Sequence, residues 1–158
     1  MGGAFFTMID LRKGEPYLRA KAAKLRLSHG LVWINTFRKP QLRNQILDWI
    51  RDDQLTQKGI DKNNEVIGFY SLTTSFIDST KTFNTHYTLD DTGQFYRSMF
   101  IRVLLDAIII DADTLKMEDK EWWRNEILGL TDDNLQKLIE IYKTTLISYA
   151  RKLLVRSF

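Results

Sequence analysis

The sequence predicts an α+β fold in which a small antiparallel sheet, built on a central β-hairpin, is packed by a long C-terminal helix and by N-terminal helices. The hairpin is predicted from two apolar runs of strand length, 99–105 and 107–111, which are rich in β-branched residues and are separated by Asp106 and its neighbours. The helices are predicted from apolar residues that recur every three or four positions in 42–50 and 135–153. With 158 residues and no internal repeat, the chain is expected to form a single domain, 1–158.

The N-terminal third begins with residues 1–14, which show no periodicity and are expected to be an arm that orders against another subunit. The arm residues expected at an interface are Phe5, Phe6, Met8 and Ile9. A helix is predicted to begin at Pro16, whose fixed φ angle suits the first helical turn, and to end at His29–Gly30. Residues 31–37 alternate weakly between apolar and polar and are interpreted as a strand or an extended link.

A second helix is predicted to begin at Pro40, because apolar residues from Leu42 to Ile50 follow at helical spacing. It is expected to end between 54 and 59, since Gly59 is a natural stop. The composition then changes over 60–87 to Asn, Asp, Thr, Ser and Lys with scattered aromatic residues, and 61–65 is interpreted as a turn. A long polar loop in a compact domain usually serves a function, and we expect that function to be interaction with another molecule.

The hairpin is expected to have short helices on either side. Before it, Asp90 or Asp91 is expected to cap a helical turn, and Gly93 is expected to take a positive φ angle or to let the backbone pass close to a neighbour. After it, residues 118–128 are predicted to form a helix that Gly129 ends. The apolar side chains that this helix would bury are Trp122, Trp123 and Ile127.

The C-terminal helix is predicted to begin after Thr131, which can cap it, with Asp132 and Asp133 near the positive end of the helix dipole. Its apolar stripe consists of Leu135, Leu138, Ile139, Tyr142, Leu146, Tyr149 and Leu153. We expect this helix to pack across the sheet that the hairpin forms.

The composition, with 44% hydrophobic and 27% charged residues, is that of a globular protein. No apolar run reaches the roughly 18 residues that a membrane helix needs, and the N-terminus lacks the pattern of a signal peptide. The absence of cysteine excludes disulfides, a thiolate metal site and a cysteine nucleophile. A soluble protein made in a reducing cytoplasm, with no membrane partner, is therefore expected.

The net charge of +3 conceals three blocks of alternating sign. Residues 1–58 carry eleven Lys/Arg and five Asp/Glu, residues 59–133 carry seven and fourteen, and residues 134–158 carry five and one, so the blocks carry +6, −7 and +4. Such a chain can offer complementary surfaces to copies of itself and a basic face to nucleic acid. In the alternative interpretation, the blocks cancel within one fold.

Acidic residues are the first candidates for an active site. Asp111 and Asp113 would share one face of a strand, and together with Asp106 and Lys116 they faintly resemble the carboxylates and lysine of metal-dependent nucleases. However, two residues separate Asp113 from Lys116, so the acidic-x-lysine part of that pattern is missing. The solvated end of a strand is favoured over a nuclease site.

Other catalytic and binding motifs are incomplete. The single run Asp91-Thr92-Gly93 would need a dimer to act as an aspartic protease. In the calcium-like run that begins at Asp61, the sixth and twelfth positions hold Val66 and Leu72 in place of Gly and Glu. The two histidines have no metal-binding context, and neither a Walker loop nor a dinucleotide fingerprint is present. We predict no enzyme activity, no catalytic or metal-binding residue and no cofactor.

A basic segment lies between Arg12 and Arg43, where nine Lys/Arg are interleaved with aromatic residues. This mixture suits the neutralisation of phosphates and stacking on bases. The possible DNA contacts are Arg19, Lys21, Lys24 and Arg26. They do not form one narrow stripe on a helix, and a solvated or subunit-facing basic surface is favoured.

The eight residues from Asp91 to Ser98 resemble the D-T-G-x-[LF]-x-x-S signature of tailed-phage neck proteins, the small head-to-tail connector and tail-completion subunits. The block from Gly59 to Ser71 resembles the segment that precedes this signature in the version found in phages and prophages of gut bacteria. The likeness covers roughly residues 54–100, although Leu89-Asp90 stands where the family often has Pro-Val. The matching residues, interpreted as a structural motif, are Asp91, Thr92, Gly93, Phe95 and Ser98.

The resemblance implies a short helix that feeds a β-hairpin, and a projecting loop or hairpin over 60–87. It also implies a non-enzymatic virion protein, made in the host bacterial cytoplasm, that forms an oligomeric ring in the neck between portal and tail. Such rings are commonly sixfold or twelvefold, and the implied partners are further copies and other portal, neck or tail proteins. Contact with genomic DNA in the channel is a further option that the resemblance leaves open. The loop residues expected at the interface are Asp61, Asn63, Phe69, Tyr70 and Phe76. The alternative is a phage DNA-binding or packaged accessory protein that uses the basic segment.

Overall fold

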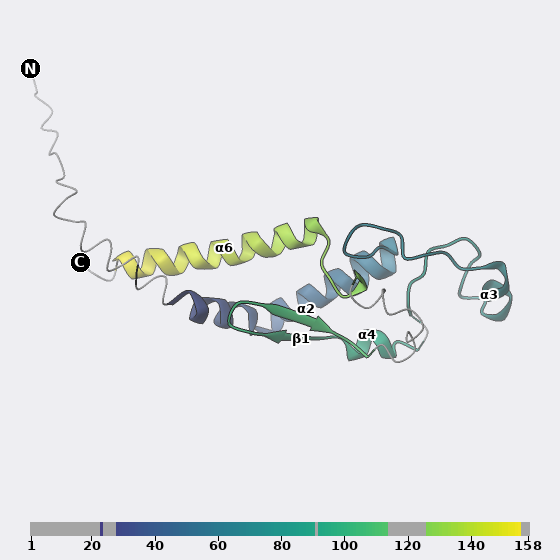
Figure 1. Ribbon diagram of the computed structural model, residues 1–158, viewed down its shortest axis with the longest axis horizontal. Helices are drawn as coiled ribbons and strands as arrows, with labels where there is room; N and C mark the ends of the chain where they lie inside the picture. The colour runs from purple at the N-terminus through teal and green to yellow at the C-terminus, as the bar shows by residue number, and fades with distance from the viewer. Residues whose placement is uncertain (1–22, 24–27, 91, 114–125, 156–158) are drawn as a thin grey trace, which may run out of the picture.

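The computed structural model describes residue 23 and residues 28–90, 92–113 and 126–155 (Figure 1). Residues 28–37 are helical, as are 126–127. The remaining elements are α2 (Pro40–Asp48), the π-helix η1 (Trp49–Lys58), α3 (Leu72–Ile77), α4 (Gln94–Ser98), β1 (Phe100–Val103), β2 (Ile108–Asp111) and α6 (Asp132–Val155). The predicted α+β class is confirmed, with helices around a two-stranded antiparallel sheet and a long C-terminal helix.

The predicted hairpin is confirmed at the centre of the chain. Ile101 of β1 lies opposite Ile110 of β2, and Val103 lies opposite Ile108. These four side chains share one face of the sheet, because side chains alternate along a strand. That face is directed to the core, where Ile101 is buried and the other three are partly buried.

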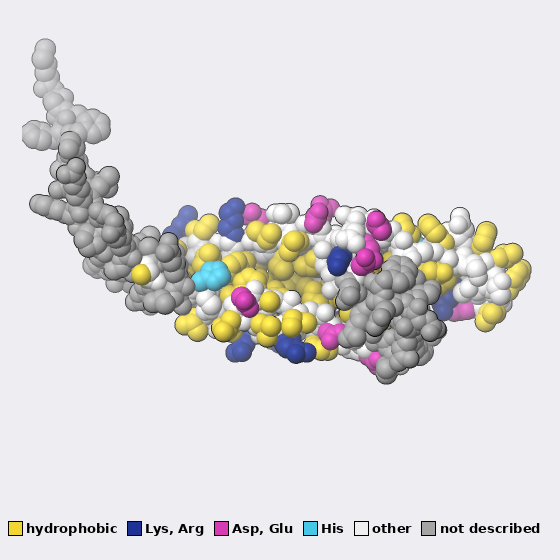
Figure 2. Space-filling view, viewed as in Figure 1, with side chains coloured by type: hydrophobic (Ala, Val, Ile, Leu, Met, Phe, Trp, Pro, Cys, Tyr) yellow, Lys and Arg dark blue, Asp and Glu magenta, His cyan; other side chains and the backbone are white. Residues whose placement is uncertain are grey.

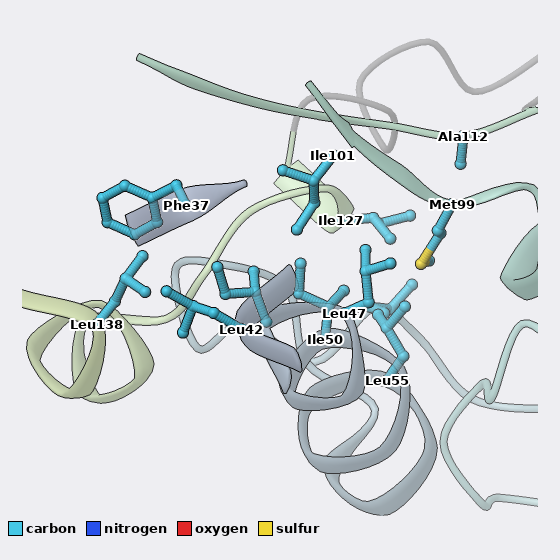
Figure 3. Close-up of a cluster of buried hydrophobic side chains, with 12 residues drawn as sticks. Phe37, Leu42, Leu47, Ile50, Leu55, Met99, Ile101, Ala112, Ile127 and Leu138 are labelled. Carbon is cyan, nitrogen blue, oxygen red and sulfur yellow. The ribbon is translucent and has the colours of Figure 1, made fainter. Parts of the chain in front are cut away.

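The core lies where the hairpin meets the helical segment 37–55, as Figure 3 shows. Its buried members are Phe37, Leu42, Ile46, Leu47, Ile50, Leu55, Ile67, Met99, Ile101, Ala112, Ile127 and Leu138. In Figure 3, Leu138 of α6 points toward Phe37 and Leu42. The predicted apolar stripe of the second helix is therefore buried against both the sheet and α6.

The interpretation of residues 31–37 as a strand or extended link is wrong, because these residues belong to a helix that continues to Phe37. Val32, Thr36 and Phe37 are buried. Thr36 and Phe37 follow Val32 by four and five residues, and a helix places side chains at these spacings on the same side. The Thr36 hydroxyl donates a hydrogen bond to the Val32 carbonyl oxygen at 2.7 Å, which closes a helical turn. The predicted helix end at His29–Gly30 is wrong for the same reason.

The second helix begins at Pro40 and ends at Lys58 as predicted, but its second half is a π-helix. Gly59 follows in the left-handed conformation, with φ at 61°, and donates its N–H to the Gln54 carbonyl oxygen. In a π-helix each backbone N–H donates to the carbonyl oxygen five residues earlier, so the turn is wider than that of an α-helix. Gln54, fully buried, lies within this turn.

The C-terminal helix begins directly after Thr131, and Asp132 and Asp133 lie in its first turn as predicted. Its packing on the sheet is bridged by the helix at 28–37. Trp33 of that helix donates its indole N–H to the Leu104 carbonyl oxygen at the hairpin turn, and its ring lies 5.2 Å from the ring of Tyr142 on α6. The sheet, the bridging helix and α6 are therefore linked through one side chain.

The predicted helix over 118–128 falls mostly outside the described residues, together with Trp122 and Trp123. Its end is described, and there Ile127 is buried as predicted. Among the described residues, we find no helix with both the length and the apolar character needed to cross a membrane.

Candidate functional site

The feature that stands out is the long connection between η1 and α4, residues 59–88, which we name the projecting loop. Figure 1 shows that it leads away from the body formed by the hairpin, α2 and α6, and that it carries α3 at its far end. Two isolated bridges, one between Ile60 and Val66 and one between Phe69 and His86, join backbone segments of the loop. The loop is therefore a defined arm with a short helix at its tip.

The projecting loop exposes large hydrophobic side chains on α3 and on the segments on either side of it. We name this group the apolar tip: its members are Phe69, Leu72, Phe76, Ile77 and Phe83. Phe76 and Ile77 are each 82% exposed, whereas the other three are 53–55% exposed. Figure 2 shows hydrophobic side chains gathered around this end of the molecule. Large apolar side chains exposed to this extent on one loop favour a site of interaction over ordinary surface.

The apolar tip is also nearly free of charge. Between residues 66 and 89 the charged residues are Asp78 and Lys81, which form an ion pair at 3.2 Å. Hydrogen bonds from the Thr80 hydroxyl and backbone, with a smaller contribution from Lys81, lower the pKa of Asp78. The tip thus offers apolar contacts without a net charge to steer or repel a partner.

Tyr70 holds the two sides of the projecting loop together. Its ring meets that of Tyr87 edge to face at 4.9 Å, and its hydroxyl lies 3.1 Å from the Thr88 hydroxyl. Its backbone N–H donates to the Thr85 carbonyl oxygen, and its own carbonyl oxygen accepts from the Asn84 N–H. Tyr70 is 9% exposed, so this residue, predicted at the interface, supports the tip from inside the loop.

Asp61 supports the base of the loop in a comparable way. It is 6% exposed, and its carboxylate accepts hydrogen bonds from the N–H groups of Asn63 and Glu65 at 2.8 and 3.0 Å. The next residue, Lys62, donates its N–H to the Glu126 carbonyl oxygen and so ties the turn to the body. The predicted turn over 61–65 is confirmed, with Asp61 facing inward and Asn63 exposed.

Of the predicted loop contacts, Phe69 and Phe76 lie in the apolar tip, whereas Leu72, Ile77 and Phe83 were missed. A signal for α3 was present in the sequence, because Ser71 is a favourable N-cap residue. In the structure the Ser71 hydroxyl accepts a hydrogen bond from the Thr74 N–H at 3.1 Å. A cap followed by Leu72 and Phe76, four residues apart, indicates a helix with one apolar side.

The base of the loop depends on Gly59, whose φ of 61° places it in the left-handed region. A Cβ atom at this position would lie 2.2 Å from the His86 ring. His86 in turn donates from Nε2 to the Thr56 carbonyl oxygen at 2.9 Å, which fastens the loop to η1. Neither the backbone conformation nor the space at residue 59 suits a side chain.

Replacement of Gly59 by alanine is therefore expected to lower the free energy of unfolding by about 2 kcal/mol, from left-handed strain and displacement of His86. Chemical denaturation followed by circular dichroism measures the change. Gly30→Ala is the matched control, because Gly30 is helical and a Cβ there meets its nearest atom at 3.8 Å. That control is expected to be neutral or stabilising by up to about 1 kcal/mol. Equal effects of the two substitutions would contradict the assignment.

The signature segment is built into the junction of α4 and the hairpin. Gly93, with φ at 67°, is the N-cap residue of α4, so the expectation that Asp90 or Asp91 caps this helix is wrong for Asp90, while Asp91 lies outside the described residues. The Arg97 guanidinium donates to the Thr92 carbonyl oxygen at 2.8 Å and closes the turn. Because α4 begins at Gln94, residue 93 and not residue 90 occupies the N-cap position.

Ser98 and Phe95 complete the motif. The Ser98 hydroxyl donates to the Phe95 carbonyl oxygen at 2.7 Å and accepts from the Asp113 N–H at 2.8 Å. The Phe95 ring is partly buried against the core. The described signature residues thus join α4 to the end of β2, which agrees with a structural role for the motif.

Tyr96 of α4 links the end of the projecting loop to η1. Its hydroxyl donates a hydrogen bond to the Thr88 carbonyl oxygen and lies 3.3 Å from the Thr56 hydroxyl. Burial, the largest influence, raises the pKa of Tyr96 to about 12 from its ordinary value of 10.0. The phenol consequently stays neutral in the folded protein at pH values where it ionises in the unfolded chain.

This pKa predicts a loss of stability between pH 10 and 12. In that window the unfolded chain binds fewer protons than the folded one, so the free energy of unfolding falls as the pH rises. Within this window each pH unit lowers the free energy of unfolding by at most about 1.4 kcal/mol. The loss is smaller than this limit because the phenol is partly exposed. Tyr96→Phe is expected to remove this slope while costing about 1 kcal/mol at neutral pH. Urea unfolding at pH 8, 10 and 11 measures both, and parallel slopes for the two proteins would contradict the prediction.

Several predicted positions fall outside the described residues. These are the arm residues Phe5, Phe6, Met8 and Ile9 and the possible DNA contacts Arg19, Lys21, Lys24 and Arg26. The carboxylates considered for a nuclease are described in part: Gln94 donates to Asp113 at 3.3 Å, and Asp111 accepts from the neighbouring Ala112 N–H. In the described part of the chain, no cluster of three or more His, Cys, Asp or Glu residues could hold a metal ion.

The apolar tip, carried by a loop whose base is fixed by Tyr70, Asp61 and His86, is therefore the candidate functional site. Comparison of the chain with protein-family models, with curated proteins and with solved structures finds no match.

Proposed function

We propose that this chain is a structural virion protein of a tailed bacteriophage, a subunit of an oligomeric neck or connector ring between portal and tail. The observation that carries the proposal is the apolar tip at the end of a supported loop. Phe76 and Ile77 are its most exposed members, and they contribute to binding energy when another molecule covers them. The protein then works through the surfaces that it shows to its neighbours, without making or breaking a bond.

The energetics of the apolar tip support a role in assembly. Full burial of a Phe or Ile side chain stabilises a protein by roughly 1.5–3 kcal/mol. Five such side chains are at least half exposed, so the isolated chain leaves several kcal/mol of favourable burial unused. The same loop keeps Tyr70 and Asp61 inside, which shows that its sequence buries side chains where the chain itself can cover them.

The arrangement of the signature also supports the proposal. The resemblance implied a short helix that feeds a β-hairpin, and α4 leads directly into β1. The blocks of opposite charge favour contacts between different faces of neighbouring copies, and such contacts close into a ring when the rotation between copies allows it. A sixfold or twelvefold ring, in contact with portal, neck or tail proteins, is the assembly that we propose.

The test is the presence and position of the chain in purified phage particles. Quantitative mass spectrometry of particles is expected to find six or twelve copies, and antibody labelling in electron micrographs is expected to fall on the neck. Deletion of the gene is expected to yield DNA-filled heads and free tails that do not join. Absence of the chain from particles, or normal tailed particles without it, would overturn the proposal.

The alternative proposal, a phage DNA-binding or packaged accessory protein, depends on Arg19, Lys21 and Lys24. It predicts that the free subunit binds duplex DNA, that the affinity falls steeply with salt, and that replacement of these three residues by Gln abolishes the binding. Fluorescence anisotropy with labelled duplex DNA measures all three. Strong binding of this kind, combined with absence from the neck, would favour the alternative.

A further inference from the structure

The outer edge of β2 carries backbone groups that point away from β1. The Leu104 N–H donates to the Ala107 carbonyl oxygen at 2.8 Å, and these two residues are the next pair in the register of the hairpin. Hydrogen-bonded and non-hydrogen-bonded pairs alternate along an antiparallel ladder, so Ile108 and Ile110 belong to non-hydrogen-bonded pairs. The N–H and carbonyl groups of these two residues are therefore directed outward.

The far end of β2 shows the same alternation. The Asp113 N–H donates to the Ser98 hydroxyl at 2.8 Å, on the side of β1, so the odd-numbered residues of this strand face β1. In the part of the chain that the structure describes, the sheet consists of β1 and β2, and no backbone hydrogen bond joins the outward groups of Ile108 and Ile110 to another segment. The outer edge of β2 can therefore accept another strand.

The side chains of β2 do not protect this edge. Natural edge strands are commonly protected by lysine, by proline or by a bulge, whereas β2 consists of three isoleucines and one aspartate. Ile109 is 37% exposed, and Ile108 and Ile110 are only partly buried. In contrast, α2 packs against β1, and β1 carries the charged Arg102. An unprotected apolar edge of this kind favours pairing with a further strand.

The two faces of the sheet define what that strand must be. An extended backbone is the partner that satisfies an edge, and its side chains alternate between the faces. One face is directed to the core, and the other exposes Phe100 and Ile109, which are 44% and 37% exposed. The added strand should therefore be uncharged and should have apolar side chains on both of its sides.

The N-terminal arm contains a segment of this kind, although it lies outside the described residues. Residues 5–9 read Phe-Phe-Thr-Met-Ile, and no charged residue precedes Asp10. In an extended conformation, Phe6 and Met8 would share one side, and the other three residues would share the opposite side. The segment also matches the four-residue length of β2.

The described chain begins beside the hairpin. Figure 1 shows that the start of the helix at 28–37, in purple, lies beyond the hairpin turn. A Cβ atom at Gly30 would lie 3.8 Å from the Leu105 side chain in that turn. The connection 10–27 has 18 residues, enough for about 27 Å as a helix and up to roughly 60 Å when extended. A start beyond the turn favours the hairpin of an adjacent copy over the chain's own hairpin.

We propose that residues 5–9 of one copy add as a strand to the outer edge of β2 in a neighbouring copy. This inference rests on the proposed function and deepens it, because it names a contact that joins copies within the ring. The added strand accepts hydrogen bonds from the N–H groups of Ile108 and Ile110 and donates to their carbonyl oxygens. The arm and the edge are unlike surfaces, so the contact can repeat from copy to copy.

The polar residue of the segment sets its orientation. Thr7 lies on the outer face of the sheet, where it meets water, and Phe6 and Met8 lie on the face that is directed to the core. Residues directly opposite each other in neighbouring strands share a face, so Phe6 and Met8 pair with Ile108 and Ile110. Thr7 then lies beside Ile109.

The chain has no cysteine, so engineered cysteines can report this contact without background. The full-length Thr7→Cys variant is mixed with full-length Ile109→Cys and oxidised at increasing concentration, and the crosslinked peptides are identified by mass spectrometry. Because each chain carries one cysteine, a disulfide between positions 7 and 109 joins different copies. Arg102→Cys replaces Ile109→Cys as the matched control, since Arg102 is exposed and lies directly opposite Ile109 on β1.

The expected result is a disulfide between positions 7 and 109 that forms about tenfold faster than one between 7 and 102. A disulfide requires Cα atoms within roughly 7 Å, and position 102 lies one strand further away, at about 10 Å from the added strand. Equal rates, faster formation of the 7–102 disulfide, or no crosslink between different copies would overturn the inference.

Hydrogen exchange provides a second measurement on the full-length chain. Met8→Pro removes an N–H donor of the added strand, and Gly3→Pro, outside the segment, is the matched control. The amides of Ile108 and Ile110 are expected to exchange about tenfold faster in Met8→Pro than in the control. The Ile109 amide, which faces β1, is the internal reference and should not change. Equal exchange of Ile108 and Ile110 in the two variants would overturn the inference.

The outcomes for this contact and for the proposed function are distinguishable. If the disulfide and the exchange effect are missing but the chain is found in the neck of particles, the inference is overturned and the proposed function stands. If both effects are observed but the chain is absent from particles, the contact stands and the proposed function is overturned.

Discussion

Replacement of Gln54 by methionine is expected to lower the free energy of unfolding by about 3–5 kcal/mol, the largest stability effect that we predict. Gln54 is fully buried in η1, and its side chain makes three hydrogen bonds to residues at the start of α6 and just before it. Its Nε2 donates to the Gly129 carbonyl oxygen at 2.9 Å. Its Oε1 accepts from the Thr131 N–H and from Asn134 Nδ2, both at 3.0 Å.

Methionine nearly matches glutamine in size but cannot take part in these bonds. Three polar groups in a buried site would lose a partner: the Gly129 carbonyl oxygen, the Thr131 N–H and one proton of the Asn134 amide. Each such loss costs about 1–3 kcal/mol. Asn134 would keep its second bond, to Asp53 at 3.1 Å. The start of α6 is therefore expected to loosen first, because it is held to η1 through this cluster.

Urea denaturation followed by circular dichroism measures the effect, and the melting temperature is expected to fall by about 6–15 °C. Gln57→Met is the matched control, since Gln57 lies in the same helix and is exposed. The double variant Gln54→Met with Asn134→Leu is expected to lose less than the sum of the single changes, because apolar groups then face each other. A loss below about 1 kcal/mol for Gln54→Met would show that the cluster does not hold α6.

A charge pair flanks this cluster. Asp53 lies 2.9 Å from Lys58, and hydrogen bonds from Lys58, the largest influence, and from Asn134 lower the pKa of Asp53. The depressed pKa means that this contribution to stability is present at neutral pH and is lost as the pH falls through the folded-state pKa. The network therefore combines a buried neutral part around Gln54 with a solvated ion pair at its rim.

The elements that could be predicted from the sequence are those whose apolar periodicity is long or unambiguous. The hairpin follows from two β-branched runs, and its register places Ile101 and Ile110 on the face that is directed to the core. Both α6 and the helix that begins at Pro40 follow from spacings of three and four. In these segments the local pattern and the tertiary packing agree, so periodicity alone was sufficient.

The helix at 28–37 could not be predicted in the same way. A seven-residue window with Leu31, Trp33 and Phe37 at odd positions imitates the alternation of a strand. The helix is fixed by contacts that are distant in sequence, since Trp33 and Phe37 both meet the Tyr142 ring. The role of Gln54 was hidden for a comparable reason, because a polar residue in an amphipathic helix is usually on the solvent side.

The loop that was expected to interact is the one that carries the apolar tip, but two of the residues expected at its surface lie inside the loop. Phe69 and Phe76 are exposed as expected of contact residues, whereas Asp61 and Tyr70 are buried. In a loop, polarity does not tell inside from outside: a carboxylate such as that of Asp61 can be buried when the turn itself supplies N–H donors. Ile77 was missed because an apolar residue is normally expected in a core.

The double replacement of Phe76 and Ile77 by aspartate is expected to weaken assembly by about 100-fold or more while leaving the folded monomer intact. Both side chains are 82% exposed, so their replacement should change the free energy of unfolding by less than about 0.5 kcal/mol. In the assembled state, two carboxylates would be placed where apolar contacts are needed, and burying an unpaired charge is costly.

Two readouts separate assembly from folding. Denaturation of the purified monomer tests the fold, and complementation of a phage that lacks the gene tests assembly, with infectious titre and particle incorporation as the measured quantities. The matched control is Thr144→Asp with Ser148→Asp, which adds the same charge at exposed positions of α6 away from its apolar stripe. The control is expected to complement fully. If the Phe76 and Ile77 variant restored infectivity and entered particles as well as the control, the apolar tip would not be a contact surface, because charged side chains cannot replace the burial that such a contact requires.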